Sequence, residues 1–260
     1  MKYLKLFLLF IRYNLIRDME FRGNFLLLIA VDILWVSFQL LLIELYFQFT
    51  GSIFGWTKPQ VFVLMGLFRI VKGVVDVFLR PNINQLPIAV NRGELDYILT
   101  KPQDSMFLAS VKRHAYTEFS TIVLGLAIFA YGLLLDGAFN FGKIVFLLFL
   151  LPFGAIMFYC LLFCFASLSP FIHRLSATYQ YYDILSNLFR FPTDFLGMQI
   201  RQLNLVLFPL AIVATVPAKF ILGKSGWNSI VAMTFISLIT LALTRRFWFF
   251  ALRRYQSASS

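Results

Sequence analysis

Residues Leu86–Pro102, LPIAVNRGELDYILTKP, separate two groups of hydrophobic segments and form the longest such separator with closely spaced charges. Its four charged side chains are Arg92, Glu94, Asp96 and Lys101. Nearly all of the chain on either side is hydrophobic. We expect a short helix here, ended by Pro102 because proline cannot continue a helix, at the mouth of a helical bundle. This segment is the part of the chain best able to contact a soluble protein.

The composition of the chain is that of a membrane protein. Of its 260 residues, 60% are hydrophobic and only 13% are charged, whereas a soluble domain is about 45–50% apolar and about 25% charged. The net charge of +11 does not indicate nucleic-acid binding, because that would need a basic face on a soluble domain. Basic residues at the cytoplasmic ends of transmembrane helices explain it. We expect a single transmembrane domain, residues 1–260, embedded in a lipid bilayer and without a nucleic-acid partner.

Residues 1–22 predict an amphipathic helix in the membrane interface. Leu4, Leu8, Ile11 and Leu15 recur at helical spacing, while basic residues occupy another face. This segment differs from a signal peptide, because arginines interrupt the apolar run and no small-residue cleavage site follows.

Hydropathy predicts an all-α polytopic membrane protein with six spanning helices, each of about 20 or more mostly apolar residues. The predicted spans are 24–48, 59–80, 107–135, 143–168, 176–197 and 226–250. The loop 81–105 separates the second span from the third. Pro209 and Pro217 interrupt the segment 198–224 before the last span. Proline at membrane depth is typical of broken helices buried in protein, so we expect 198–224 to be an outer re-entrant segment.

The identity of the fifth span stays open between two segments. Residues 177–197 are polar for a span, and 203–222 are apolar but contain both prolines. A polar helix fits a span that is shielded from lipid and faces an interior pathway. Either choice gives six spans, whereas using both would give seven and put the arginine-rich C-terminus outside.

The distribution of basic residues predicts the orientation. With the N-terminus inside, 15 of the 23 Lys and Arg residues fall on the cytoplasmic side, five fall on the outer side and three lie inside predicted spans. Cytoplasmic loops carry the excess of Lys and Arg. Both termini and the 81–105 loop are therefore predicted to be cytoplasmic.

No pattern typical of an enzyme or a metalloprotein is visible. Gly223-Lys224-Ser225 looks like the end of a phosphate-binding loop, but alanine stands where the first glycine is needed. His114 and His173 belong to no metal-binding pattern. Cys160 and Cys164, four apart in one apolar helix, are poorly placed for a disulfide. We expect no catalytic residue, no metal site and no cofactor in this chain itself.

Charged residues inside the predicted spans are the other candidates for a functional role, because a charge at the bilayer centre is costly. The candidates among them are Asp32, Arg69, Lys72, Asp76, Asp183 and Arg190. Lys72 and Asp76 are four apart on one helix and can pair. Two interpretations stay open. These charges line a translocation pathway or partner interface, or they pair internally and only set the packing of the helices.

A family resemblance lies in Arg92-Gly93-Glu94-Leu95-Asp96-Tyr97-Ile98-Leu99-Thr100-Lys101-Pro102. This stretch resembles the signature G-x-L-D, two residues, L, then K/R-P, between the second and third spans of ABC type-2 exporter permeases. It is most similar to the uncharacterised or daunorubicin-type subgroup. Pro209 with Val216-Pro217-Ala218 and Leu222-Gly223 resembles the outer segment before the last span. Arg253-Arg254-Tyr255-Gln256-Ser257 resembles the R-x-Y-x-S tail.

The resemblance implies a permease subunit whose loop docks onto a separate ATPase. The residues it implies in coupling are Arg92, Gly93, Glu94, Leu95, Asp96, Leu99, Lys101 and Pro102. Leu95 and Leu99, four apart, would form an apolar edge that enters a groove on the partner. Gly93 would permit a bend or a close approach.

The resemblance also implies partners and a location. Two cytoplasmic ATPase subunits would bind ATP and Mg, and a second permease, identical or related, would complete a dimer. The assembly would lie in the bacterial cytoplasmic (inner) membrane. The aromatic-rich spans favour an amphipathic substrate, such as a drug, lipid or glycolipid. Two other functions fit the residues: a secondary transporter or channel that uses the intramembrane charges, and a membrane scaffold that transports nothing.

Overall fold

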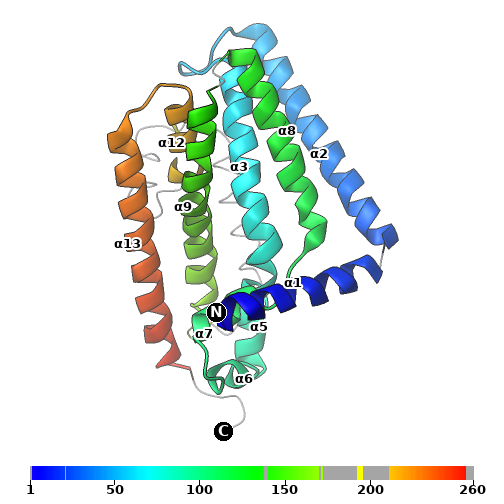
Figure 1. Cartoon of the computed structure of the whole chain (residues 1–260), viewed down its shortest axis with the longest axis vertical. Helices are drawn as coiled ribbons and strands as arrows, with labels where there is room; N and C mark the ends of the chain where they lie inside the picture. The colour runs from blue at the N-terminus through cyan, green and yellow to red at the C-terminus, as the bar shows by residue number, and fades with distance from the viewer. Residues whose placement is uncertain are drawn as a thin grey trace.

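Long helices, aligned side by side, form a bundle in the computed structural model (Figure 1). The structure describes residues 2–20, 22–137, 140–169, 171, 192–195 and 211–255. Its helices are α1 Lys2–Glu20, α2 Arg22–Phe49, α3 Lys58–Phe78, α4 Arg80–Ile83, α5 Leu86–Asn91, α6 Asp96–Leu99, α7 Ser105–Val111, α8 Phe119–Asp136, α9 Phe141–Ala166, α12 Ala211–Ile221 and α13 Trp227–Leu252. Single 3-10 turns cover Tyr116–Glu118 and Thr193–Phe195. No strand occurs in this described part, so the predicted all-α class is confirmed.

Four helices among the described residues are long and apolar enough to cross a membrane. They are α2, the helix Tyr116–Asp136 that includes α8, α9 and α13. α3 has 21 residues but does not join this group, because Lys58, Arg69, Lys72 and Asp76 lie within it. Most of the predicted fifth span, 176–197, lies outside the described residues, so the count of six stays a prediction.

α3 is the central helix of the bundle. Fifteen of its 21 residues are buried, whereas only Val36 and Ile43 are buried among the 28 residues of α2. Thr57 and Gln60 form a capping box at the start of α3, with Pro59 in the first turn. Arg69 and Asp76 of α3 are therefore buried in protein, while most of the apolar surface of α2 is exposed.

Glycines bring α3 and α8 into backbone contact. A Cβ atom added to Gly66 would lie 2.5 Å from the backbone nitrogen of Phe129, and one added to Gly132 would lie 2.7 Å from that of Val63. Gly73 and Gly125 are also too close to the facing helix to accept a Cβ atom. Small residues that let helix backbones approach are a common packing device in membranes. These four glycines, the α3–α8 glycine seam, lock the two helices into one unit.

The predicted span 107–135 is wrong at its start, because the helix is interrupted at residues 112–115. Asn82 of α4 stabilises the break. Its Oδ1 accepts from the Arg113 backbone N–H (2.6 Å), and its Nδ2 donates to the Arg113 carbonyl (2.7 Å). Ala115 N–H donates to the Val77 carbonyl at 2.9 Å. These bonds satisfy the backbone groups that leave the helix, so α7 and α8 form separate elements.

α1 runs across the lower end of the bundle (Figure 1). Asn14 donates to the Lys112 carbonyl (3.1 Å), Asp18 accepts from the Tyr116 N–H (3.0 Å), and the Tyr116 hydroxyl donates to the Ile11 carbonyl (3.1 Å). Large apolar side chains, including Ile16, remain exposed on it. This placement suits the predicted amphipathic helix, and its position in the membrane interface stays a prediction.

The described part of the predicted re-entrant segment forms α12, which contains Pro217. α12 packs on α9 and α3, near the upper ends of the long helices (Figure 1). The first part of the predicted segment, residues 198–210, lies outside the described residues. Re-entry of this segment therefore stays a prediction.

Candidate functional site

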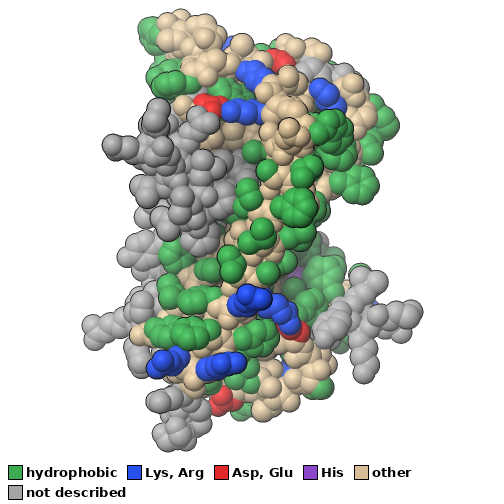
Figure 2. Space-filling model, turned by 90° about the vertical axis from the view of Figure 1, so that its left-hand side faces the viewer, with side chains coloured by type: hydrophobic (Ala, Val, Ile, Leu, Met, Phe, Trp, Pro, Cys, Tyr) green, Lys and Arg blue, Asp and Glu red, His purple; other side chains and the backbone are tan. Residues whose placement is uncertain are grey.

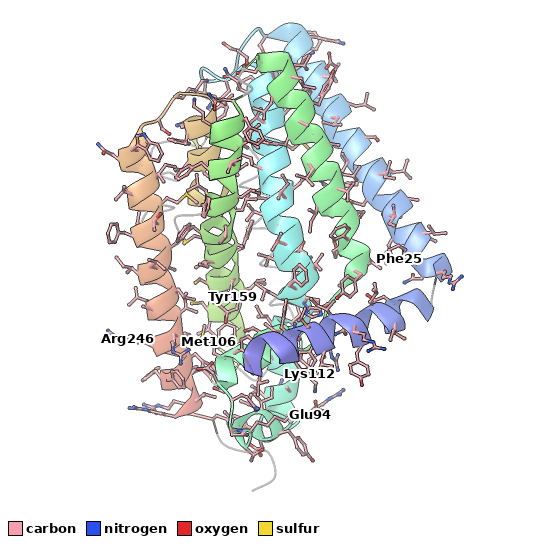
Figure 3. All side chains as sticks on the ribbon, viewed as in Figure 1. Phe25, Glu94, Met106, Lys112, Tyr159 and Arg246 are labelled. Carbon is pink, nitrogen blue, oxygen red and sulfur yellow. The ribbon has the colours of Figure 1, made fainter. Side chains whose placement is uncertain are left out.

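The 86–102 segment lies at the same end of the bundle as α1 and the C-terminal end of α13 (Figure 1), and Glu94 marks its position in Figure 3. The prediction of one short helix is wrong, because the segment forms two helices, α5 and α6. Gly93 separates them with a φ of 71°. A residue with a side chain adopts this left-handed conformation at a cost of about 1–2 kcal/mol. The glycine thus permits a sharp turn, as the sequence indicated.

Leu95 does not form the predicted apolar edge with Leu99. It is 0% exposed and belongs to the hydrophobic core, whereas Leu99 is 38% exposed. Spacing of four residues shows only that two side chains share a helix face. It does not show how a single turn such as α6 meets the rest of the protein. Leu95 therefore anchors the segment from within, and Leu99 remains outside.

Exposed residues of the second half of this segment include Arg92, Glu94, Tyr97, Leu99, Lys101 and Pro102, which we call the coupling surface. Tyr97 is its most exposed large side chain, at 75%, and was not among the predicted site residues. The sequence did contain one indication of its role, because Tyr97 is an aromatic residue among the charged residues of the segment. Arg92 and Glu94 form an exposed ion pair of 3.8 Å, which contributes little to stability. Asp96 is half-buried.

Polar contacts join the neighbouring α7 to α13 and α9. Asp104 caps α7 through the Phe107 N–H (3.0 Å) and pairs with Arg245 of α13 (2.5 Å). The Trp248 indole of α13 donates to the Ser105 hydroxyl at 3.2 Å. Farther along α7, a hydrogen bond of 2.9 Å joins Ser110 to Tyr159 of α9 (Tyr159 is labelled in Figure 3). None of these long-range contacts was predicted. They connect α7, which follows the coupling surface in the chain, to two of the candidate membrane spans.

Two of the predicted intramembrane charges form a pair between helices. Arg69 of α3 donates to Asp32 of α2 at 2.6 Å. Ser120 and Thr121 of α8 donate to the other carboxylate oxygen of Asp32, at 2.9 and 3.1 Å. The Arg69 side chain is almost fully buried. Asp32 thus joins three helices, in agreement with the interpretation that these charges set helix packing.

The predicted pair of Lys72 and Asp76 is confirmed. Asp76 is fully buried and also lies 3.5 Å from Arg80 of α4. Asp183 and Arg190 lie outside the described residues, so their roles stay predictions.

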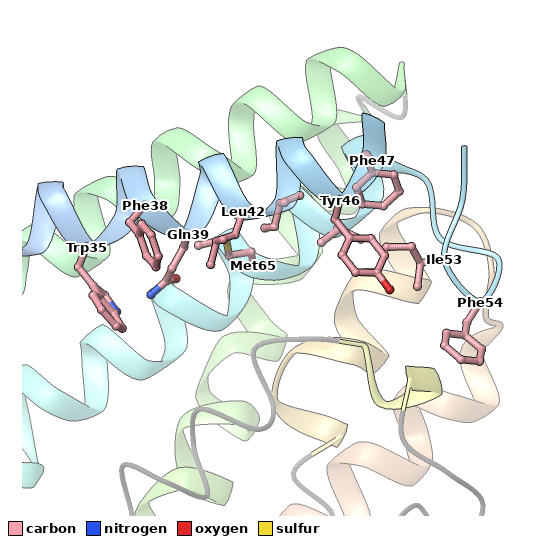
Figure 4. Close-up of a pocket in the computed structure, with 11 residues that line it drawn as sticks. Trp35, Phe38, Gln39, Leu42, Tyr46, Phe47, Ile53, Phe54 and Met65 are labelled. Carbon is pink, nitrogen blue, oxygen red and sulfur yellow. The ribbon is translucent and has the colours of Figure 1, made fainter. Parts of the chain in front are cut away.

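An apolar groove of about 590 Å³ lies between α2, α3 and the loop after α2 (Figure 4). Its lining includes the aromatic side chains of Trp35, Phe38, Tyr46, Phe47 and Phe54. Gln39 contributes an amide, and none of the described residues in the lining carries a charge. Ligand sites for small molecules have volumes of about 300–1,000 Å³ and combine apolar walls with a few polar groups. The groove has this size and composition.

A polar cluster joins three separate segments at the opposite end from the coupling surface. The buried Trp56 donates its indole N–H to Asp194 (2.9 Å), and Lys219 of α12 pairs with Asp194 (2.7 Å). The Lys224 ammonium lies 4.8 Å from the centre of the Trp56 ring. Burial lowers the pKa of Lys224, and the charge of Lys219 acts in the same direction. This cluster links the loop before α3 to the Thr193–Phe195 turn and to α12.

Within the described part of the chain, no group of three or more His, Cys, Asp or Glu side chains could hold a metal ion. Cys160 and Cys164 are free thiols.

Comparison with known protein families shows where the chain belongs. The family model for ABC-2 family transporter proteins matches residues 33–259. No curated protein and no solved structure matches the chain. The match extends from within α2 to beyond α13 and so includes the 86–102 segment, the groove and the pair of Lys72 with Asp76, while Asp32 lies one residue before its start. This chain is therefore a member of the ABC-2 transporter family.

Proposed function

We propose that this chain is the permease subunit of an ATP-driven ABC exporter of the uncharacterised or daunorubicin-type subgroup. Membership of the ABC-2 family implies a membrane subunit without its own nucleotide-binding domain. ATP and Mg would be bound by separate cytoplasmic ATPase subunits, and a second permease, identical or related, would complete the transporter. It would lie in the bacterial cytoplasmic membrane with both termini inside.

The observation that carries this proposal is the combination of exposure and anchoring at the 86–102 segment. The side chains of Tyr97 and Lys101 are exposed where a partner could contact them, while Leu95 fixes the segment to the core. Closure of the ATPases on ATP would press on the coupling surface. The bonds of Asp104 and Ser105 would then pass this movement to α13.

If the ATPase docks on the coupling surface, Tyr97→Ala should weaken the binding of the ATPase without unfolding the permease. Exposed tyrosines are frequent hot spots, and their loss often costs 2 kcal/mol or more. We expect permease-stimulated ATP hydrolysis in liposomes to fall at least about tenfold. The assay uses the ATPase that co-purifies with the permease in mild detergent.

Tyr13→Ala on α1 is the matched control, since Tyr13 is 69% exposed and distant in sequence from the segment. Leu95→Ala is unsuitable as a test, because a cavity at a buried leucine costs about 2–5 kcal/mol of stability. If the Tyr97→Ala permease stimulated ATP hydrolysis as strongly as the wild type, the coupling surface would not be the docking site of the ATPase.

The groove between α2 and α3 supports an amphipathic substrate. Its aromatic walls suit a hydrocarbon or ring system. Among the candidate spans in the described part of the chain, α2 has the smallest buried share, so a ligand dissolved in lipid would reach the groove from the bilayer.

Filling the groove should block binding of a fluorescent amphipathic drug such as daunorubicin. Leu42 lines the groove, and Leu42→Trp is expected to weaken binding about tenfold by occupying the space. Leu41→Trp places the same bulk on a neighbouring face of α2, outside the groove, and should bind as the wild type does. Titration by the anisotropy of the drug in detergent measures both. Equal affinity in the two variants would exclude this groove as the binding site.

The alternatives of a secondary transporter, a channel or a scaffold receive less support. A transporter that used Asp32, Arg69 and Lys72 as an ion relay would need these charges to face an aqueous path. Here each forms an ion pair inside the bundle. Substrate transport driven by a proton gradient in liposomes without any ATPase would favour the secondary transporter.

A further inference from the structure

The lower end of α13 carries two arginines and two phenylalanines on one exposed stripe. Arg246, Phe249, Phe250 and Arg253 follow the spacing i, i+3, i+4 and i+7, which places them on one helix face. All four side chains are exposed. At 1.5 Å per residue, the two arginines are separated by about 10 Å along the helix. We call these four residues the Arg–Phe stripe.

The stripe continues an apolar surface that belongs to a membrane-spanning helix. Ile239 and Leu243 precede Arg246 on the same face, and both are exposed. α13 is long and apolar enough to cross a membrane. Figure 2 shows basic side chains among hydrophobic ones at the lower end of the face that α13 occupies. Basic side chains at the end of an apolar spanning helix are typical of the level at which acyl chains give way to headgroups.

The arginines of the stripe are available for an anion. Arg245, which precedes them, is occupied by Asp104 and stacks on Phe249 at 5.2 Å. Among the described residues, no acidic side chain forms an ion pair with Arg246 or Arg253. A guanidinium group matches phosphate geometry with two parallel hydrogen bonds. Positive charge without a protein partner at a bilayer boundary attracts anionic lipid.

We propose that the Arg–Phe stripe binds an anionic phospholipid. Its phosphate group would lie between Arg246 and Arg253, and an acyl chain would extend over Phe250 and Leu243 toward Ile239. The ring of Phe171 stacks on Phe250, with centroids 6.1 Å apart, and supports one side of the site. The two arginines favour an anionic headgroup. The apolar side chains next to them favour a lipid with acyl chains over a soluble anion.

The test measures lipid that stays with the purified full-length protein. The protein is reconstituted into vesicles of equimolar phosphatidylcholine and phosphatidylglycerol, extracted in mild detergent, and analysed by native mass spectrometry. The wild type should retain phosphatidylglycerol in preference to phosphatidylcholine. The double variant Arg246→Gln/Arg253→Gln should lose about 30-fold of this preference, as expected for two basic groups near a charged membrane.

The matched control is Arg92→Gln/Lys101→Gln, which removes the same charge from the exposed 86–102 segment. It should retain phosphatidylglycerol as the wild type does. Thermal melting of all three proteins in neutral detergent checks that they are folded. Equal retention of the two lipids by the wild type, or an undiminished preference in the Arg246/Arg253 variant, would overturn the proposal. So would displacement of the lipid by glycerophosphate alone, since this would show an anion site without acyl-chain recognition.

Discussion

Replacing Gly66 with alanine is expected to force α3 and α8 apart. The added methyl carbon would lie 2.5 Å from the Phe129 backbone nitrogen and 2.6 Å from its Cα atom. A backbone cannot rotate away as a side chain can, so the helices must separate. Overpacking of this kind costs about 1–3 kcal/mol. We expect the free energy of unfolding, measured by denaturant titration in detergent, to fall by this amount, and Gly132→Val to cost more.

Gly23→Ala is the control for the glycine seam. Gly23 lies in α2, and no atom of the facing protein lies within 4 Å of an added Cβ atom. Alanine favours a helix over glycine by about 1 kcal/mol, so this variant should be as stable as the wild type or more stable. A Gly66→Ala protein that is also unchanged would mean that α3 and α8 are not in backbone contact.

Removing the carboxylate of Asp32 should have a still larger effect. Asp32→Ala leaves the Arg69 guanidinium buried without its counter-charge, and breaking a buried pair in this way costs about 3–5 kcal/mol. The double variant Asp32→Ala/Arg69→Met removes both charges and should recover much of that loss. A double-mutant cycle from denaturant titrations in detergent measures the coupling energy.

Glu44→Ala provides the comparison for an exposed pair. Glu44 and Lys58 lie 2.9 Å apart, but their side chains are 49% and 35% exposed, so their pair should contribute about 1 kcal/mol or less. If Asp32→Ala cost no more than Glu44→Ala, the Arg69 site would be solvated. The interpretation of these charges as a packing device would then be wrong.

Much of the membrane architecture could be predicted from local pattern. α2, α9 and α13 lie close to their predicted ranges, because a long apolar run has few other stable forms in a bilayer. The pairing of Lys72 with Asp76 follows from helix geometry alone. The break at residues 112–115 could not be predicted in this way. It depends on Asn82, whose side chain reaches across 31 residues to satisfy the freed backbone of Arg113.

The candidate site shows the same limit. The motif placed the 86–102 segment correctly as a distinct element between α3 and α8, and Gly93 marked its turn. Which side chains face outward depends on the angle at which α6 meets the core, and this angle has no local signature. Leu95 is therefore inside, and Tyr97 outside. The pairing of Arg69 with Asp32 joins residues 37 apart in the chain, so only the packing of α2 against α3 shows it.

The burial of α3 has a consequence for biosynthesis. During insertion, each charged residue near the centre of a helix opposes partitioning into lipid by about 2.5–3.5 kcal/mol. Arg69, Lys72 and Asp76 make α3 a poor candidate to enter the bilayer alone. Its counter-charge Asp32 is synthesised earlier, in α2, and the glycines of α8 emerge later. α3 would therefore be retained at the translocon until α8 is synthesised, and α2, α3 and α8 would enter the membrane together.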